Sequence, residues 1–259
     1  MGDVLVAEAE GLREAAQDCV CVERPSARSA VLLICEHASP RLPRGFGDLG
    51  LSREALASHI AWDPGALAVA RGLSVALDAT LIHQTYSRLI YDCNRPPDAA
   101  GAMPARSEIY DIPGNENIAE SERIARTEAL YIPFHAAVSR EIALRKARKR
   151  ETVIVTIHSF TPVYYGRQRA VEIGILHDTD SRFADAMLHA AEGVAGFRTE
   201  RNEPYGPEDG VTHSLILHGI AQGLRNVMIE VRNDLLQDEA GQKVVTGYLG
   251  ALIEQSLET

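Results

Sequence analysis

The sequence lacks the marks of a membrane-spanning or nucleic-acid-binding protein. No apolar run approaches the roughly 20 residues that cross a bilayer. The chain has no excess of basic residues, because its formal net charge is −10 and its pI is about 5.4. Such a balance argues against a polyanionic nucleic acid or an acidic membrane surface as the main partner. We therefore expect a small or overall neutral substrate whose anionic parts meet local arginines.

The chain also lacks the features of a secreted disulfide scaffold. Its four cysteines, Cys19, Cys21, Cys35 and Cys93, form no paired C-x-x-C spacing and are few for 259 residues. We interpret them as reduced thiols. The N-terminal stretch MGDVLVAEAEGLREAAQDC carries acids where a signal peptide would have a basic flank, so a cytoplasmic location is expected.

Five short apolar runs have the length and composition of buried strands: AVLLIC (30–35), ATLIHQ (79–84), TVIVTI (152–157), VEIGIL (171–176) and NVMIEV (226–231). Segments with helical periodicity lie between and after them, at 63–77, 120–150, 181–195, 211–224 and from about Glu239 to the end. This alternation predicts an α/β fold with a mostly parallel, mixed sheet covered on both faces. With no internal repeat or linker, we expect one three-layer αβα domain over 1–259.

Polar residues that bind metals follow several of these strands. Ligands of open α/β sheets bind beyond the carboxyl ends of the strands, and there the sequence places CEHASPRLP, TYSRLIYDCNRPP and HSFTPVYYG. His37 and His158 both end a candidate strand, which makes a purely structural histidine a weaker explanation for either. Histidine and carboxylate with an open position are the ligands of a catalytic zinc. We therefore predict a divalent metal, Zn²⁺, at this edge of the sheet.

Glu230 interrupts the apolar strand NVMIEV. Burial of an unpaired carboxylate is very costly, so this residue needs a partner or a function. One alternative is a buried ion pair with Arg232 or another arginine. The other is a general base beside the metal, with a pKa raised by partial desolvation.

The motifs resemble two groups of hydrolases. TIHSF followed by YYG, and then IEVRND, resembles the second half of a zinc carboxypeptidase site, and CNRPP resembles the Asn-Arg pair that holds a substrate carboxylate there. More closely, CEHAS, HIAWDPGA, YSRLIYDCNRP, HSFTP and IEVRNDL together resemble the N-formylglutamate amidohydrolase family. These motifs span about residues 31 to 236, and SRLIYDCNRP is the most specific of them.

The resemblance implies a zinc-carboxypeptidase-like (phosphorylase/hydrolase-like) fold and hydrolysis of the acyl amide of an N-acyl acidic amino acid. The substrate implied is N-formyl-L-glutamate, cleaved to formate and glutamate, a reaction of histidine degradation. Unlike the His-x-x-Glu of carboxypeptidases, His37 is followed three residues later by Pro40. We expect His37, Asp63 and His158 to hold the metal. Glu36 remains the alternative carboxylate, and Asp63 has a competing role as the N-cap before Pro64.

The remaining expectations concern the substrate. A guanidinium matches a carboxylate with two parallel donors, so we expect Arg88 and Arg95 to hold substrate carboxylates, with Arg95 also a catalytic cation. Asn94 would add a hydrogen bond and Tyr165 would cover the substrate. The structural alternatives are an Arg88–Asp92 ion pair, a surface position for Arg95 and simple packing of the tyrosine.

Two other functions stay open. The first is a metal-free hydrolase that uses Cys35 as nucleophile, although this cysteine lies in an apolar run where it behaves as a small hydrophobe. The second is a non-catalytic protein that binds acidic amino acids. His213 and His218 are five residues apart, a poor spacing for one helical face, so no second metal site is predicted there. His59, Arg167 and Arg169 receive no role, and the oligomeric state is not predicted.

Overall fold

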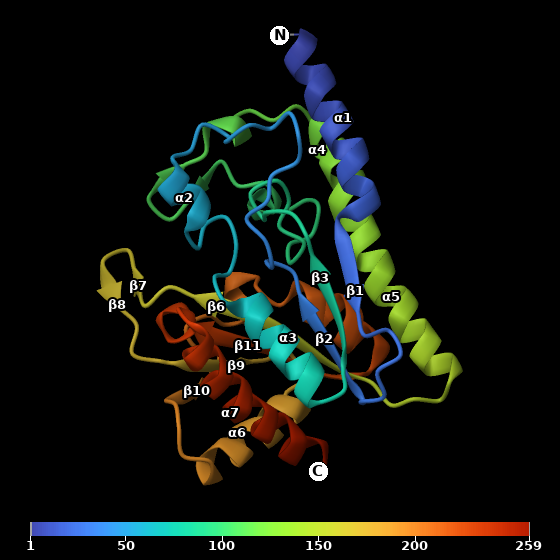
Figure 1. Cartoon of the computed structure of the whole chain (residues 1–259), viewed down its shortest axis with the longest axis vertical. Helices are drawn as coiled ribbons and strands as arrows, with labels where there is room; N and C mark the ends of the chain where they lie inside the picture. Colours follow the sequence, from blue (N-terminus) through green and yellow to red (C-terminus); the bar gives the residue numbers. More distant parts are fainter. Residues whose placement is uncertain (1, 259) are drawn as a thin grey trace.

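A computed structural model describes residues 2–258 and shows a seven-stranded sheet with helices on both faces (Figure 1). The strand order is β1-β3-β2-β6-β11-β9-β10. The strands are β1 (Val20–Glu23), β2 (Val31–Cys35), β3 (Thr80–Gln84), β6 (Val153–Phe160), β9 (Ile173–Leu176), β10 (Thr199–Arg201) and β11 (Arg225–Arg232). The predicted mostly parallel, mixed α/β sheet is confirmed.

Parallel pairing holds through the middle of the sheet, where β3, β2, β6 and β11 are neighbours. The edge strand β1 is antiparallel to β3, and β9 is antiparallel to β11. β2 and β6 are buried along their whole length. Such continuous apolar runs are typical of parallel strands covered on both faces.

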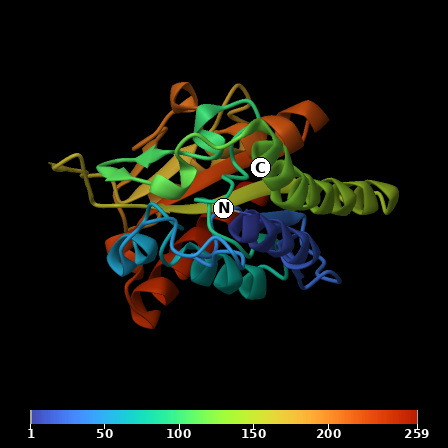
Figure 2. The same cartoon turned by 90° about the horizontal axis from the view of Figure 1, so that it is seen from above.

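Helices cover the two faces, as the view from above shows (Figure 2). α3, α6 and α7 pack together against one face, whereas α5 crosses the other, and α1 lies beside α4 (Figure 1). The helices are α1 (Gly2–Asp18), α2 (Arg53–Ala57), α3 (Ala66–Ala76), α4 (Glu120–Arg126), α5 (Ile132–Ala147), α6 (Arg182–Gly193) and α7 (Glu239–Leu257). Each face has its own buried apolar cluster. No helix among the described residues is long and apolar enough to cross a membrane.

Two predicted helices are interrupted. The 120–150 segment is α4 and α5 joined by a π-helical turn at Thr127–Tyr131, and within 211–224 the backbone forms a π-helical turn at Leu215–Gly219. Two small hairpins extend beyond the carboxyl edge of the sheet. They are β4 (Arg106–Ser107) with β5 (Tyr110–Asp111), and β7 (Val163–Tyr164) with β8 (Arg167–Gln168).

Candidate active site

The carboxyl edge of three adjacent strands carries the polar side chains of the candidate site. His158 on β6 is the register partner of Glu230 on β11. Neighbouring strands lie about 5 Å apart and paired residues project to the same face. His37 lies two residues beyond the end of β2, the other neighbour of β6. The structure therefore brings together three candidate residues from distant parts of the chain.

Asp63 reaches the same place from the turn before α3. Its backbone N–H donates to the carbonyl of His37 at 2.9 Å, which ties the two loops together. Gly65 follows with a φ of 82°, and a Cβ there would lie 2.4 Å from the Leu236 side chain. Gly65 is also the N-cap of α3 and makes no side-chain cap. Asp63 therefore does not take the capping role, and its carboxylate faces the histidines.

Three ligand atoms of the types that bind zinc converge here. The Nδ1 atoms of His37 and His158 lie 3.2 and 3.0 Å from Oδ2 of Asp63. All three residues are buried, and their ligand atoms lie within 4.8 Å of one another. Two imidazoles and a carboxylate that open to a cavity are a donor set of catalytic zinc sites. The residues present thus fit a divalent cation, and we call them the metal group.

Two more carboxylates contact the outer nitrogens of the histidines. Nε2 of His37 lies 2.7 Å from Oδ1 of Asp92, and Nε2 of His158 lies 3.1 Å from Oε2 of Glu36. A carboxylate at one ring nitrogen keeps the proton there and leaves the lone pair of the other nitrogen for a metal. Glu36 thus lies at the ring nitrogen that faces away from Asp63, and it is not part of the metal group.

The charges around the metal group are predominantly negative. Burial by itself lowers the pKa of His158, but the carboxylates of Glu36 and Asp63 raise it well above its usual value. Burial raises the pKa of Asp92, yet Arg88 and His37 hold it well below its usual range. The resulting cluster of buried carboxylates creates a field that favours a bound cation.

Glu230 is a buried carboxyl without an ion-pair partner among the described residues. Its side chain lies at 5% exposure, and Oε2 accepts no hydrogen bond. Arg232, the partner considered above, pairs instead with Glu172 and Asp234. Burial raises the pKa of Glu230 to about 7, against the opposing charge of His158. A group that titrates near neutrality beside a metal group is a candidate general base.

These groups open into a cavity of about 600 Å³, a volume that suits a small ligand. Its walls come from the carboxyl edge of the sheet and from both small hairpins. The cavity contains Glu230, the metal group and four arginines, which are Arg88, Arg95, Arg106 and Arg169. Anionic substrates therefore meet several cations next to the metal group.

Arg88 lines the cavity at the point where its guanidinium lies against the metal group. Its guanidinium donates to Oδ2 of Asp92 at 2.5 Å and to Oδ1 of Asp63 at 3.4 Å. The ion pair with Asp92 that the sequence offered as an alternative is therefore present. Two carboxylates neutralise much of the charge that Arg88 would offer to a substrate.

Asn94 and Arg95 contact the segment that precedes the second π-helical turn. The amide of Asn94 donates to the carbonyl of Val211 at 2.5 Å and accepts from the N–H of Ser214 at 3.0 Å. Arg95 donates through Nη1 to the carbonyls of residues 209–210. Both side chains line the cavity. The remaining donors of Arg95 leave it available to a ligand, whereas the amide of Asn94 already bonds at both ends.

Arg169 is a cavity residue to which the sequence assigned no role. Its guanidinium lies 4.3 Å from the ring centre of Tyr164, 4.7 Å from that of Tyr205 and 5.6 Å from that of Phe160. Nη1 donates to the hydroxyl of Tyr205 at 2.9 Å. Aromatic rings on several sides hold a cation by cation–π contact while restricting its rotamers. Arg169 therefore presents a fixed positive charge in the cavity.

Tyr165 lies at the rim, where the two hairpins meet. Its backbone N–H donates to Oε1 of Glu108 at 2.9 Å, and Oε2 of Glu108 lies 3.0 Å from Nε2 of His59. The Tyr165 side chain is 60% exposed and lines the cavity. One carboxylate thus links both hairpins to the loop after α2.

Cys35 has an environment that opposes nucleophilic catalysis. Its side chain is fully buried, and it does not line the cavity. Burial, followed by the charge of Asp63, raises the pKa of the thiol well above its usual value. Because the thiolate is the nucleophile, this geometry favours the metal-dependent alternative over the cysteine hydrolase.

The histidines of the 211–224 segment have partners on the first π-helical turn and on α5. Nε2 of His218 lies 2.7 Å from Nδ1 of His135, and Nε2 of His213 lies 2.8 Å from the hydroxyl of Tyr131. Burial is the largest cause that lowers the pKa of His135 to about 3 and of His218 to about 4. His135 and His218 are therefore neutral imidazoles that join α5 to the second π-helical turn.

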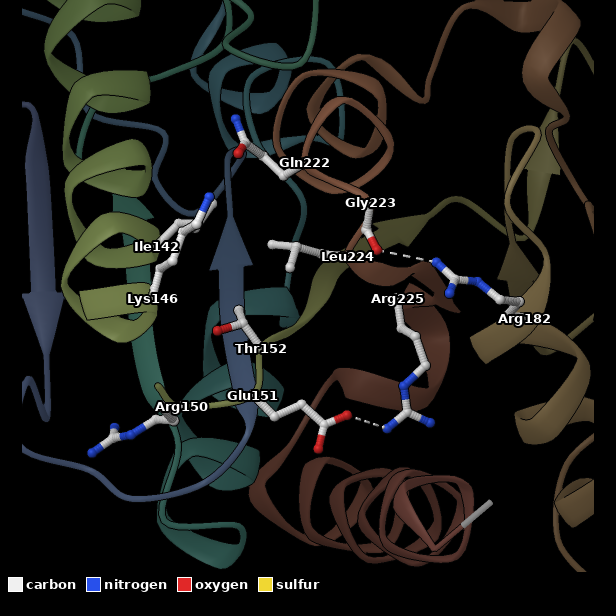
Figure 3. A pocket seen from close by; sticks show the side chains of 10 residues that line it. All are labelled: Ile142, Lys146, Arg150, Glu151, Thr152, Arg182, Gln222, Gly223, Leu224 and Arg225. Atoms are coloured by element: carbon white, nitrogen blue, oxygen red, sulfur yellow. Dashed lines mark hydrogen bonds and ion pairs between the residues drawn. The ribbon is translucent and has the colours of Figure 1, made fainter. Parts of the chain in front are cut away.

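A second cavity of about 410 Å³ lies at the amino-terminal ends of β6 and β11 (Figure 3). Most of its charged side chains already have partners within the protein. Arg225 contacts Glu151 at 2.8 Å and Arg182 donates to the carbonyl of Gly223 at 3.3 Å, as the dashed lines in Figure 3 mark. No residue of the metal group lines it. The larger cavity at the carboxyl edge is therefore the candidate active site.

Comparison with known proteins agrees with this geometry. The model of the N-formylglutamate amidohydrolase family matches residues 29–237, well over half of the chain. The chain belongs to the N-formylglutamate amidohydrolase family. All of the candidate site residues lie within the matched range, and membership in this family makes the protein a hydrolase of amide bonds. None of the curated proteins matches the chain.

Two solved structures share the fold of this family member. A gene product of Agrobacterium tumefaciens is 60% identical, with 95% of this chain and 97% of that chain covered and a TM-score of 0.92. An N-formylglutamate amidohydrolase from Ralstonia eutropha is 18% identical, with 93% and 97% covered and a TM-score of 0.61. The second likeness is one of fold alone.

Proposed function

We propose that this family member is a metal-dependent hydrolase that removes the formyl group from N-formyl-L-glutamate. The observation that carries the proposal is the convergence of the metal group with Glu230. Three buried ligand atoms lie within 4.8 Å of one another, and the carboxyl of Glu230 on the strand next to His158 has a pKa of about 7 and no ion-pair partner among the described residues. These are the parts that hydrolysis of an unactivated amide requires.

His37, Asp63 and His158 would hold the cation, and Asp92 and Glu36 would fix the orientation of the two imidazoles. The bound cation supplies Lewis acidity, which makes water a better nucleophile and polarises the substrate carbonyl. Glu230 accepts a proton from the attacking water. It then returns this proton to the departing amine, a transfer for which a pKa near neutrality is well suited.

The two carboxylates of glutamate require two cations in the same cavity. Arg88 is committed to Asp63 and Asp92, which leaves Arg95 and Arg169 as the better placed anchors. Arg169 is held by its aromatic neighbours, with Nε and Nη2 unused among the described residues. We assign one substrate carboxylate to each of these two arginines, because a guanidinium offers paired donors to two oxygens.

The decisive experiment combines metal analysis with a substrate series. The purified protein is stripped with a chelator, reloaded with Zn²⁺ and assayed for formate release from N-formyl-L-glutamate, with N-acetyl- and N-succinyl-glutamate as competitors for the assignment of the acyl group. We expect activity that disappears on chelation and returns with the metal. Inactivation by iodoacetamide alone, with no effect of the chelator, would instead establish the cysteine mechanism.

Glu230→Gln separates an enzyme from a binding protein. This variant should retain the metal and bind N-formyl-L-glutamate while losing hydrolysis. If the metal-loaded parent binds the ligand and releases no formate or other acyl group from any member of the series, the proposed activity is wrong.

A further inference from the structure

A second group of metal-binding side chains lies at the edge of the sheet. Cys21 and Glu23 are two apart on β1 and therefore project to the same face, and His83 on β3 is the register partner of Cys21. One ligand atom from each lies within 4.8 Å of the other two. None of the three lines the catalytic cavity.

The contacts of His83 suit coordination through Nε2. Its Nδ1 lies 3.2 Å from the carbonyl of Gln84, which can only accept a hydrogen bond, so Nδ1 is a donor. Nε2 lies 2.9 Å from Oε1 of Glu23, which also can only accept, so a bound cation takes the place of the hydrogen that Nε2 shares with this carboxylate, and that proton leaves to solvent. A backbone carbonyl on the far nitrogen is a common orienting partner of a metal-bound histidine.

Glu23 also has an orienting partner. Arg71 on α3 donates to Oε1 through Nε at 2.9 Å and contacts the same oxygen through Nη2 at 2.8 Å. Oε2 has no partner among the described residues. Glu23 can therefore bind a cation through Oε2 while Oε1 keeps its ion pair with Arg71. This ion pair holds the carboxylate in position and does not occupy the oxygen that would bind the cation.

We propose that Cys21, Glu23 and His83 form a second site for a divalent cation, of the borderline-soft class to which Zn²⁺ belongs. One sulfur, one imidazole nitrogen and one carboxylate oxygen are each common zinc ligands, and water completes a tetrahedral set. Cys21 and Glu23 are only partly buried, so an ion reaches them from solvent. Binding displaces the thiol proton of Cys21 to solvent.

The consequence of this site is structural. β1 is an edge strand of four residues and, among the described residues, pairs with β3 alone. Short edge strands are easily frayed and expose unpaired backbone groups. A cation held by two side chains of β1 and one of β3 fastens this edge, and Arg71 extends the tie to α3. This role is independent of the proposed catalytic activity.

Cobalt titration tests the site without reference to activity. The metal group around Asp63 contains no sulfur, so a sulfur-to-cobalt charge-transfer band in the near ultraviolet reports only a site with a cysteine ligand. The chelator-stripped parent, kept reduced, is titrated with Co²⁺. We expect a saturable band that Cys21→Ser abolishes. Cys35→Ser is the control and should keep the band. Cys35 on β2 is also a register partner of His83, but it does not belong to the group formed by Cys21, Glu23 and His83.

Two further variants check the other ligands. Glu23→Gln and His83→Gln should each weaken Co²⁺ binding measured from the band by at least about tenfold, with thermal unfolding used to establish that each variant folds. Hydrolysis by Cys21→Ser should match the parent after reloading with Zn²⁺. Absence of a band in the saturated parent, or a band that survives in Cys21→Ser, would overturn the proposal.

Discussion

The Nδ1 atoms of His37 and His158 lie 3.1 Å apart, on rings whose opposite nitrogens each contact a carboxylate. In the neutral rings that metal binding requires, the outer nitrogens carry the hydrogens and the two facing nitrogens both present lone pairs, which repel one another. A cation between them converts this repulsion into coordination. The pair is therefore arranged for a shared ion more than for a hydrogen bond.

His158→Ala and His37→Ala should each abolish metal retention and hydrolysis. Removing a ligand should weaken metal binding by more than the roughly 10- to 100-fold typical of an orienting partner. The matched control is His59→Ala, which alters a cavity histidine that contacts Glu108 and lies outside the metal group. Metal content per chain and formate release are the measurements. Equal metal retention in all three variants would refute the assignment.

Asp92→Asn should weaken metal binding although Asp92 is not itself a metal ligand. Loss of the carboxylate that orients Nε2 of His37 is expected to lower metal affinity about 10- to 100-fold. Asp98→Asn, on the exposed loop that follows, is the control and should bind as the parent does. Competition with a chromophoric chelator gives the affinities, and indistinguishable values for the two variants would contradict the orienting role.

Glu230→Gln should lower kcat by about 10²- to 10⁴-fold while the metal is retained. In the parent, kcat/KM should rise with pH, because the base must be deprotonated. Burial raises the pKa of Glu230 to about 7, and a bound cation lowers it again, so the rise should be complete at or below about pH 7. The acid limb should vanish from the residual activity of the variant. Parent activity that falls through this range would exclude Glu230 as the base.

The same carboxyl should affect the stability of the metal-free protein. The folded-state pKa lies above the ordinary value of 4.5, so the folded chain binds this proton more tightly than the unfolded chain does. Binding of this proton stabilises the folded state fully below pH 4.5, and the stabilisation is lost as the pH rises through about 7. Glu230→Gln should therefore be more stable than the parent at pH 8, by on the order of 1–3 kcal/mol, with little difference at pH 4. Urea unfolding at the two pH values measures this, and a variant less stable at pH 8 would contradict it.

Arg169→Gln should remove the preference for a charged side chain. Loss of one charge-assisted contact costs about 1.5–3 kcal/mol, so kcat/KM for N-formyl-L-glutamate should fall roughly 10- to 100-fold, with little change for N-formyl-L-glutamine. Arg167→Gln is the control, because Arg167 is exposed on β8, two residues before Arg169, and lies outside the cavity lining. A parallel loss for both substrates would indicate a structural role for Arg169.

The central strands of the sheet could be predicted from the sequence because each of them is a continuous apolar run, which can be recognised without knowing the rest of the fold. Continuous β-branched runs between helical segments indicate buried parallel strands, and the chemistry at their ends follows from the rule that parallel strands share a carboxyl edge. His158 and Glu230 could therefore be expected to meet. The short antiparallel strand β1 was not predicted, because four residues of modest hydrophobicity are too few to show a strand's alternation of apolar and polar residues.

The parts that depend on loop geometry could not be predicted. Whether Asp63 caps α3 or faces the histidines is decided by the left-handed turn at Gly65, which no periodicity encodes. The aromatic surroundings of Arg169 arise only when the β7–β8 hairpin brings Tyr164 near Tyr205. The Cys21 group requires an antiparallel register between strands some sixty residues apart, and no sequence spacing reveals that register.

The cavity is built from two kinds of element, the strand ends of the sheet and the small hairpins, and this has an evolutionary consequence. The hydrolytic chemistry that we propose uses buried strand ends and the turn before α3, whereas Arg106, Tyr165 and Arg169 reach the cavity from two small hairpins and the loop that follows one of them. Insertions or substitutions in these appendages can change which acyl amino acid enters without disturbing the catalytic centre. New specificities should thus arise in this lineage by remodelling of the rim, with the strands left intact.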